Sequence, residues 1–235
     1  MKMNSAIQQP FLRMELVACF IVATCFASAR SQEYEVSEIR NGPSKESLPA
    51  ALAKEFESKG SRVTRESNKT VCDIWLRNPL DVVADFVESK DLLYPFKQGQ
   101  LIGLVHFPRR TSEFRQQTME SGWYTLRFGL QPVDGNHVGT SPTRDFLLMV
   151  KAENDQVDKT WSVKELLTAS AEVAGSSHPA MMCLQRVDKA AESKSSIRHN
   201  EEKDWWTLRL VGKGNADGKS QDVVIDMIVA GHAAE

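Results

Sequence analysis

The stretch GWYTLRFGL at Gly122–Leu130 decides the fold class of this chain, which has 235 residues. Apolar side chains recur at every second position of the stretch, at Tyr124, Leu126, Phe128 and Leu130. Successive side chains of an extended strand point to opposite faces, so these four share one face, whereas Thr125 and Arg127 share the other. The stretch therefore predicts a half-buried β-strand, followed by a polar loop and a second strand that begins at Asp145.

Other segments of the chain also show strand patterns. Val71–Arg77 alternates and stops before a proline, and Leu101–Phe107 is apolar on both faces, as a strand between two layers is. Further strands are expected at Met181–Val187, Trp205–Val211 and Val223–Val229, with a hairpin loop at Gly212–Gly218 between the last two.

Two short helices complete the expected fold. Ser47 can cap the first, which would end at Gly60, and Ser162 begins the second, where Glu165 completes a capping box and Gly175 ends the helix. Together the elements predict a mainly β fold, an antiparallel β-sandwich or barrel-like sandwich of about seven to eight strands with two short accessory helices.

The N-terminus has the pattern of a secretory signal peptide. Lys2 and Arg13 precede the apolar run Leu16–Ala27, and small residues at Ala27 and Ala29 suit a signal peptidase. The run is shorter than the roughly 20 residues of a membrane span. We expect residues 1–29 to be removed, which makes the mature protein secreted or periplasmic. A lipid anchor on Cys25 is the alternative, because the residues before it loosely resemble a lipoprotein box.

The remaining chain is expected to divide into two parts. Residues 30–45 are polar and aperiodic and predict a flexible N-terminal arm, and residues 46–235 predict a single β-rich domain. The formal net charge of −2 offers no basic stripe, so we expect no nucleic-acid partner, and the mature chain has no apolar stretch long enough for a transmembrane helix. Cys72 and Cys183 lie beyond the signal and could pair in an oxidising compartment, which makes them the candidate pair for a disulfide.

The loop after the strand at Gly122–Leu130 holds the candidate metal ligands. Asp134 and His137 lie close together, Asp145 begins the next strand, and carboxylate and imidazole groups bind zinc and similar ions. A third ligand would come from His106 or His178. The same Asp-Gly-Asn sequence is ordinary turn chemistry, and we expect the turn. No catalytic residue can be assigned, and no cofactor-binding motif is present in the sequence.

The block from Gly122–Arg127 through Asp134–Gly139 to Arg144–Phe146 resembles a signature of uncharacterised bacterial secreted proteins. Those proteins also begin with a signal peptide and carry a strand like Ile74–Arg77. The resemblance implies export and a β-rich fold, and it implies no activity. We therefore expect an exported binding or structural module with an unknown ligand or protein partner. The alternative is a metal-dependent enzyme or metal-binding protein that uses Asp134, His137 and Asp145.

Overall fold

The computed structural model describes residues 33–66, 69–132, 143–188 and 194–233. The chain from Gln32 onward forms one compact unit. Its strands are β1 (Tyr34–Ile39), β2 (Gly60–Arg65), β3 (Lys69–Leu76), β4 (Leu80–Asp81), β5 (Leu101–Phe107), β6 (Thr111–Ser112), β7 (Thr118–Met119), β8 (Gly122–Leu130), β9 (Asp145–Lys151), β10 (Met181–Gln185), β11 (Ser196–Asn200), β12 (Trp205–Ala216) and β13 (Lys219–Ala230). The helices are α1 (Ala50–Ala53), the 3₁₀ turn η1 (Ala152–Asn154) and α2 (Val163–Ala174).

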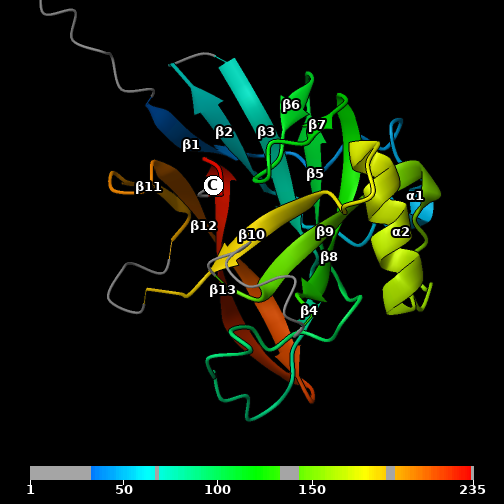
Figure 1. Ribbon diagram of the computed structural model, residues 1–235. Coiled ribbons are helices and arrows are strands. Elements are labelled where there is room, and N and C mark those ends of the chain that lie inside the picture. The colour runs from blue at the N-terminus through cyan, green and yellow to red at the C-terminus, as the bar shows by residue number, and fades with distance from the viewer. Residues whose placement is uncertain (1–32, 67–68, 133–142, 189–193, 234–235) are drawn as a thin grey trace, which may run out of the picture. The chain divides into compact units, whose positions relative to one another are not determined.

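The strands form one large sheet that curls strongly on itself (Figure 1). Their order is β1-β2-β3-β5-β8-β9-β10-β13-β12-β11, and all neighbours in this order are antiparallel. The short β4 adds to β12 in the parallel sense, which makes 11 strands, and β6 and β7 form a separate hairpin. The mainly β fold with two α-helices is confirmed. One continuous curled sheet takes the place of the two stacked sheets expected, because β10 carries the pairing from one half to the other.

Strand β10 changes partner along its length. Met181–Cys183 pair with β9, whereas Leu184 and Gln185 pair with β13. At the opposite side, the sheet ends at β1 and at β11, and no backbone ladder joins these two strands within the described residues. A side-chain contact lies there instead, since the rings of Tyr34 and Trp206 have centroids 5.0 Å apart. We call this open side the seam.

The concave face of the sheet holds the main core. Tyr124, Leu126 and Phe128 of β8 all lie in it, which confirms the face that the alternation predicted. The prediction that β8 is half-buried is wrong, because Thr125 and Arg127 on the other face are buried as well. The chain after η1 covers that outer face.

A segment without regular structure fills the lower end of the concave face. Residues 82–98 follow β4 and place Leu93, Tyr94 and Phe96 in the main core. Figure 1 shows this segment as a loop at the lower end of the sheet. Because its apolar residues fill a space instead of forming a strand or helix, they follow neither period of two nor period of 3.6.

Two predictions near the N-terminus are wrong. The expected flexible arm at residues 30–45 contains β1, which pairs with β2 along its whole length. The expected helix from Ser47 to Gly60 shrinks to the four residues Ala50–Ala53, which follow Pro49 without a side-chain cap. The arm is ordered because β2 pairs with it, and the helix ends early because the chain after it runs beside the end of β3, where Phe56 bridges Arg77 and the Glu57 N–H donates to the Leu76 carbonyl.

Helix α2 forms as predicted. The Ser162 side chain accepts the Glu165 backbone N–H, the Glu165 carboxylate accepts the Ser162 N–H, and Gly175 has φ 58° in the left-handed region. The helix packs on the outer face of β9, where Leu166 contacts Phe146 and Leu148 in a second cluster. It lies at the side of the sheet away from the seam (Figure 1).

The hairpin of β12 and β13 is longer than predicted. The ladder continues to the pair Ala216 and Lys219, so only Asp217 and Gly218 form the turn, with φ 49° and 84°. Two positive φ values suit the right-handed twist of a tight hairpin. Gly212 and Gly214, expected in the loop, belong to the strand.

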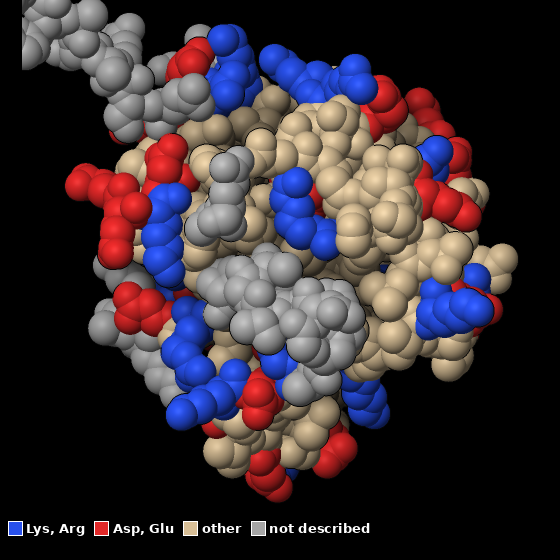
Figure 2. Space-filling view, viewed as in Figure 1, with Lys and Arg blue, Asp and Glu red and all other residues tan. Residues whose placement is uncertain are grey.

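The surface of the described unit is mixed in charge. On the face drawn in Figure 2, basic and acidic side chains are interspersed around the margin, and uncharged surface lies between them. Among the described helices, none has the length and apolar character needed to cross a membrane.

Candidate functional site

Of the three predicted metal ligands, the structure describes Asp145. Asp134 and His137 lie outside the described residues. Asp145 is fully buried at the start of β9, and its Oδ1 accepts the backbone N–H groups of Leu93 at 3.0 Å and Tyr94 at 3.2 Å. Burial raises the pKa of this carboxyl, and its Oδ2 has no hydrogen-bond partner among the described residues. The contacts of Asp145 that the structure describes therefore hold the segment at residues 82–98 in place.

The two other histidines considered as ligands lie apart from Asp145. His106 stacks on Trp123 with ring centroids 4.4 Å apart, and His178 is exposed beyond α2. Within the described ranges, no group of three or more His, Cys, Asp or Glu side chains is arranged to hold a metal ion.

Cys72 and Cys183 are not joined by a disulfide in the structure, and both thiols are buried. Cys72 of β3 belongs to the main core, and Cys183 of β10 packs with Trp205 and Ile228 in a separate cluster. In the sheet, β5, β8 and β9 lie between the two strands. The sequence placed both residues in strands correctly, but it carries no signal for the sheet order that separates them.

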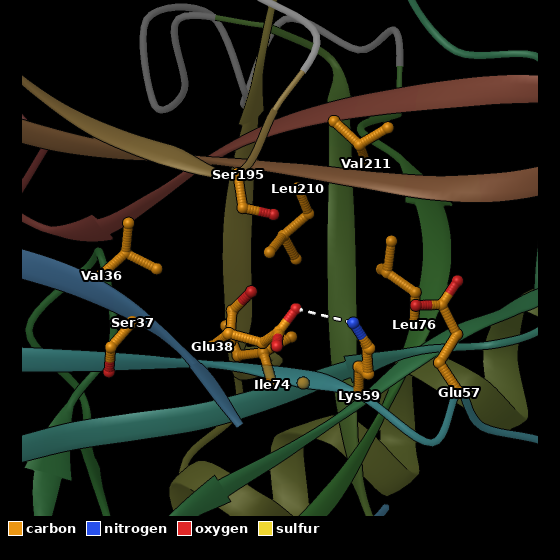
Figure 3. A pocket seen from close by; sticks show the side chains of 12 residues that line it. Val36, Ser37, Glu38, Glu57, Lys59, Ile74, Leu76, Ser195, Leu210 and Val211 are labelled. Carbon is orange, nitrogen blue, oxygen red and sulfur yellow. Dashed lines mark hydrogen bonds and ion pairs between the residues drawn. The ribbon is translucent and has the colours of Figure 1, made fainter. Parts of the chain in front are cut away.

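A cavity of about 370 Å³ lies at the seam, between β1–β3 on one side and β12 on the other. Its floor consists of apolar side chains from the concave face, Ile74 and Leu76 of β3 and Leu210 of β12. In Figure 3 these point into the same space from opposite strands. The strand register explains the arrangement, because Glu38, Ser61 and Ile74 are direct cross-strand neighbours and their side chains share one face.

Polar groups line the remainder of the cavity. The Lys59 ammonium is 3.1 Å from the Glu38 carboxylate, and this ion pair crosses the cavity in Figure 3. Arg40 lies 3.8 Å from the other oxygen of Glu38. Two hydroxyl side chains also belong to the lining: Ser61 lies in β2, and Ser195 is the residue immediately before β11.

Glu57 supplies a second carboxylate to the cavity. It precedes β2, and its backbone N–H donates to the Leu76 carbonyl at 2.9 Å, which fixes it beside β3. Burial raises the pKa of its carboxyl, although a hydrogen bond from the Lys213 backbone N–H opposes this rise. A Cβ on Gly212 would lie 2.8 Å from Leu76 Cδ1 and 3.7 Å from Glu57 Oε1. The glycine therefore leaves the space that Leu76 and Glu57 occupy.

A second cluster of polar side chains lies on the outer face of the same strands. Arg62 binds Asp73 through two hydrogen bonds of 2.7 and 2.8 Å, and His106 Nδ1 lies 4.0 Å from Asp73. Burial lowers the pKa of His106, and the Asp73 carboxylate opposes this fall. The residues are direct neighbours across β2, β3 and β5. Because Arg62 and Asp73 already satisfy each other, the arrangement stabilises strand pairing.

Sequence reasoning missed the cavity residues. Tyr34, Val36 and Glu38 alternate with outward residues, which is a strand signal inside the segment that we expected to be a flexible arm. No comparable signal marks Glu57 or Gly212, because they meet only when the sheet curls. Comparison with protein-family models, with curated proteins and with solved structures finds no match for this chain.

Proposed function

We propose that the protein is an exported binding protein that holds a small amphipathic ligand in the seam cavity. The observation that carries the proposal is a cavity of about 370 Å³ with an apolar floor and a few charged and hydroxyl groups around it. Ligand sites in proteins are commonly cavities of roughly 300–1,000 Å³. The lining of this one combines five apolar side chains with three charged and three hydroxyl side chains, which suits a ligand that is itself both apolar and polar.

The position of the cavity in the sheet supports a binding role. The main core fills the concave face elsewhere, with Leu126, Phe128 and Leu208 among its fully buried residues. At the seam, β1 and β12 approach through side chains and leave space between them. An apolar chain placed there would add contacts to Ile74, Leu76 and Leu210.

Export is supported by the N-terminal sequence. Lys2 and Arg13, the apolar run Leu16–Ala27 and the small residue Ala29 follow the order of a cleaved signal. The cavity belongs to the part of the chain after this signal, so removal of residues 1–29 leaves the proposed site intact.

Titration with the neutral fluorescent probe N-phenyl-1-naphthylamine tests the binding function. We expect saturable binding of one probe to the parent protein. Ser195→Trp places an indole at the mouth of the cavity, and we expect it to weaken probe binding roughly tenfold or more, because the added side chain takes the volume of the ligand. Ser112→Trp is the matched control, since Ser112 is exposed and does not line the cavity. Equal binding by all three proteins, or no saturable binding, would refute the proposal.

A further inference from the structure

We infer that the ligand of the seam cavity is an amphipathic amine, with its ammonium group paired with Glu57 and its apolar chain over Ile74, Leu76 and Leu210. This inference rests on the proposed binding function, and it adds the chemical class of the ligand. Three observations on the described residues carry it.

The first observation is that the charges around the cavity are unequally compensated. Glu38 has Lys59 at 3.1 Å and Arg40 at 3.8 Å, so two cations face this carboxylate. Glu57 has no ion pair with any cation among the described residues. Glu57 is therefore the one carboxylate of the described lining that forms no salt bridge, although the Lys213 charge acts on it from a longer distance.

The second observation is that the nearest lysines are already engaged. The Lys59 Nζ is turned toward Glu38 (Figure 3), and the Lys213 Nζ binds Asp222 at 2.5 Å. Lys213 offers Glu57 a hydrogen bond from its backbone N–H and an attraction between charges, but its ammonium forms its ion pair with Asp222. A carboxylate has lone pairs for about four hydrogen bonds, so Glu57 keeps acceptor capacity for a ligand.

The third observation is the position of Glu57 relative to the apolar floor. Glu57 is half-buried beside Leu76, and both residues line the cavity. A carboxylate that is partly removed from water gains most from a partner of opposite charge. An ammonium group on an apolar chain provides that partner, and its chain removes further apolar surface from water. A carboxylate ligand would instead meet repulsion from Glu57.

The test uses three probes with the same chain, octylamine, octanoate and 1-octanol, in isothermal titration of the mature protein at neutral pH. We expect octylamine to bind roughly tenfold tighter than 1-octanol, and octanoate to bind weakest, because only the ammonium forms a charge-assisted hydrogen bond with Glu57. Glu57→Gln should reduce octylamine binding to the level of 1-octanol and leave 1-octanol unchanged.

Two further variants complete the experiment. Glu55→Gln is the control, because Glu55 pairs with Arg77 at 3.1 Å and does not line the cavity, so its octylamine affinity should equal that of the parent. Lys59→Met removes one positive charge from the lining of the cavity, where Lys59 pairs with the exposed Glu38. We therefore expect this variant to bind octylamine more tightly than the parent does. It also tests the inference if Glu57→Gln fails to fold.

The outcomes separate the ligand class from the binding function. Octanoate as the tightest probe, or octylamine binding that is unaffected by both Glu57→Gln and Lys59→Met, would overturn the amine while the cavity remains a binding site. Absence of binding for all three probes and for N-phenyl-1-naphthylamine would overturn the proposed function itself, and the amine with it.

Discussion

The Tyr94 hydroxyl accepts the backbone N–H of Asp226 at 2.9 Å, although the two residues are 132 positions apart in the sequence. The same hydroxyl donates to the Gln185 carbonyl at 2.6 Å. Gln185 is the end of β10 and pairs with Asp226 of β13. Tyr94 therefore stands at the place where β10 has left β9 and joined β13, and it ties the irregular segment at residues 82–98 to that junction.

The first prediction concerns this tyrosine. Tyr94→Phe removes the hydroxyl and leaves the buried Asp226 N–H without that acceptor, so we expect a loss of about 1–3 kcal/mol in the free energy of unfolding, measured by urea denaturation. Tyr124→Phe is the control, because the Tyr124 hydroxyl has only the Glu120 carbonyl, at 2.9 Å, and its loss should be smaller. Equal losses would show that Tyr94 has no special place at the junction.

A second prediction follows from Asp145. Burial raises the pKa of its carboxyl in the folded protein above the unfolded value. The folded state then binds the proton more tightly, so stability decreases as the pH rises through the interval between the two pKa values. Asp145→Asn keeps an acceptor oxygen for Leu93 and Tyr94 and does not titrate.

We therefore expect the stability of Asp145→Asn relative to the parent to increase from about pH 4 to about pH 7, measured by urea denaturation at each pH. Asp158→Asn alters an exposed carboxylate and should show a flat difference over the same range. A flat difference for Asp145→Asn as well would contradict a raised pKa.

The third prediction concerns the buried pair on the outer face of β8. Arg127 donates to both oxygens of Asp155, at 2.7 and 2.9 Å, and both side chains are almost fully buried. Asp155→Ala would leave the guanidinium buried without its carboxylate, so we expect a loss of about 3–5 kcal/mol in chemical denaturation. The exposed pair of Lys213 and Asp222 gives the comparison, where Asp222→Ala should change stability by less than about 1 kcal/mol. Similar losses for the two variants would refute the argument.

The fourth prediction concerns the thiols. Cys72 and Cys183 are buried, and burial raises the pKa of Cys72, which disfavours the reactive thiolate. We expect no reaction with a thiol reagent in the native mature protein and two reactive thiols after unfolding without reductant. Fewer than two thiols in the unfolded protein would show a disulfide that the structure does not contain.

The fifth prediction concerns export. We expect the protein recovered from the exporting compartment to have the intact mass of a chain that begins at Arg30, because Ala27 and Ala29 suit a signal peptidase. A mass that includes Met1, or one that shows a lipid on Cys25, would exclude simple cleavage after Ala29.

Sequence patterns correctly predicted those features that depend on residues close to one another in the chain. The inward row of Tyr124, Leu126 and Phe128 and the capping box of Ser162 and Glu165 depend on residues close in sequence, and both form. The cover over Thr125 and Arg127 comes from Asp155, about thirty positions away, and strand periodicity contains no information about a partner at that distance. For this reason β8 was expected to be half-buried and is buried on both faces.

The seam cavity could not be predicted for a related reason. Glu57, Leu76 and Gly212 come from three segments, and they meet because the sheet curls far enough to bring β12 against β3. Curvature results from the summed twist of many strands, and no single residue pattern specifies it. The metal-ligand hypothesis used residues that are close in sequence. Asp145 accepts the backbone N–H groups of Leu93 and Tyr94, whereas Asp134 and His137 lie outside the described residues, so the hypothesis stays a prediction.

The open seam also determines where the molecule is mechanically weakest. Around the remainder of the sheet, each strand is joined to the next by backbone hydrogen bonds. In the part of the chain that the structure describes, no ladder joins β1 to β11, and the ring contact at this side runs from Tyr34 of β1 to Trp206 of β12. We expect the curled sheet to open first at the seam when the protein is heated or pulled, because separation of the strands there breaks no backbone hydrogen bonds between paired strands. A ligand bound in the seam cavity would contact the strands on both sides of the seam. Ligand binding would therefore make the sheet more rigid at this side.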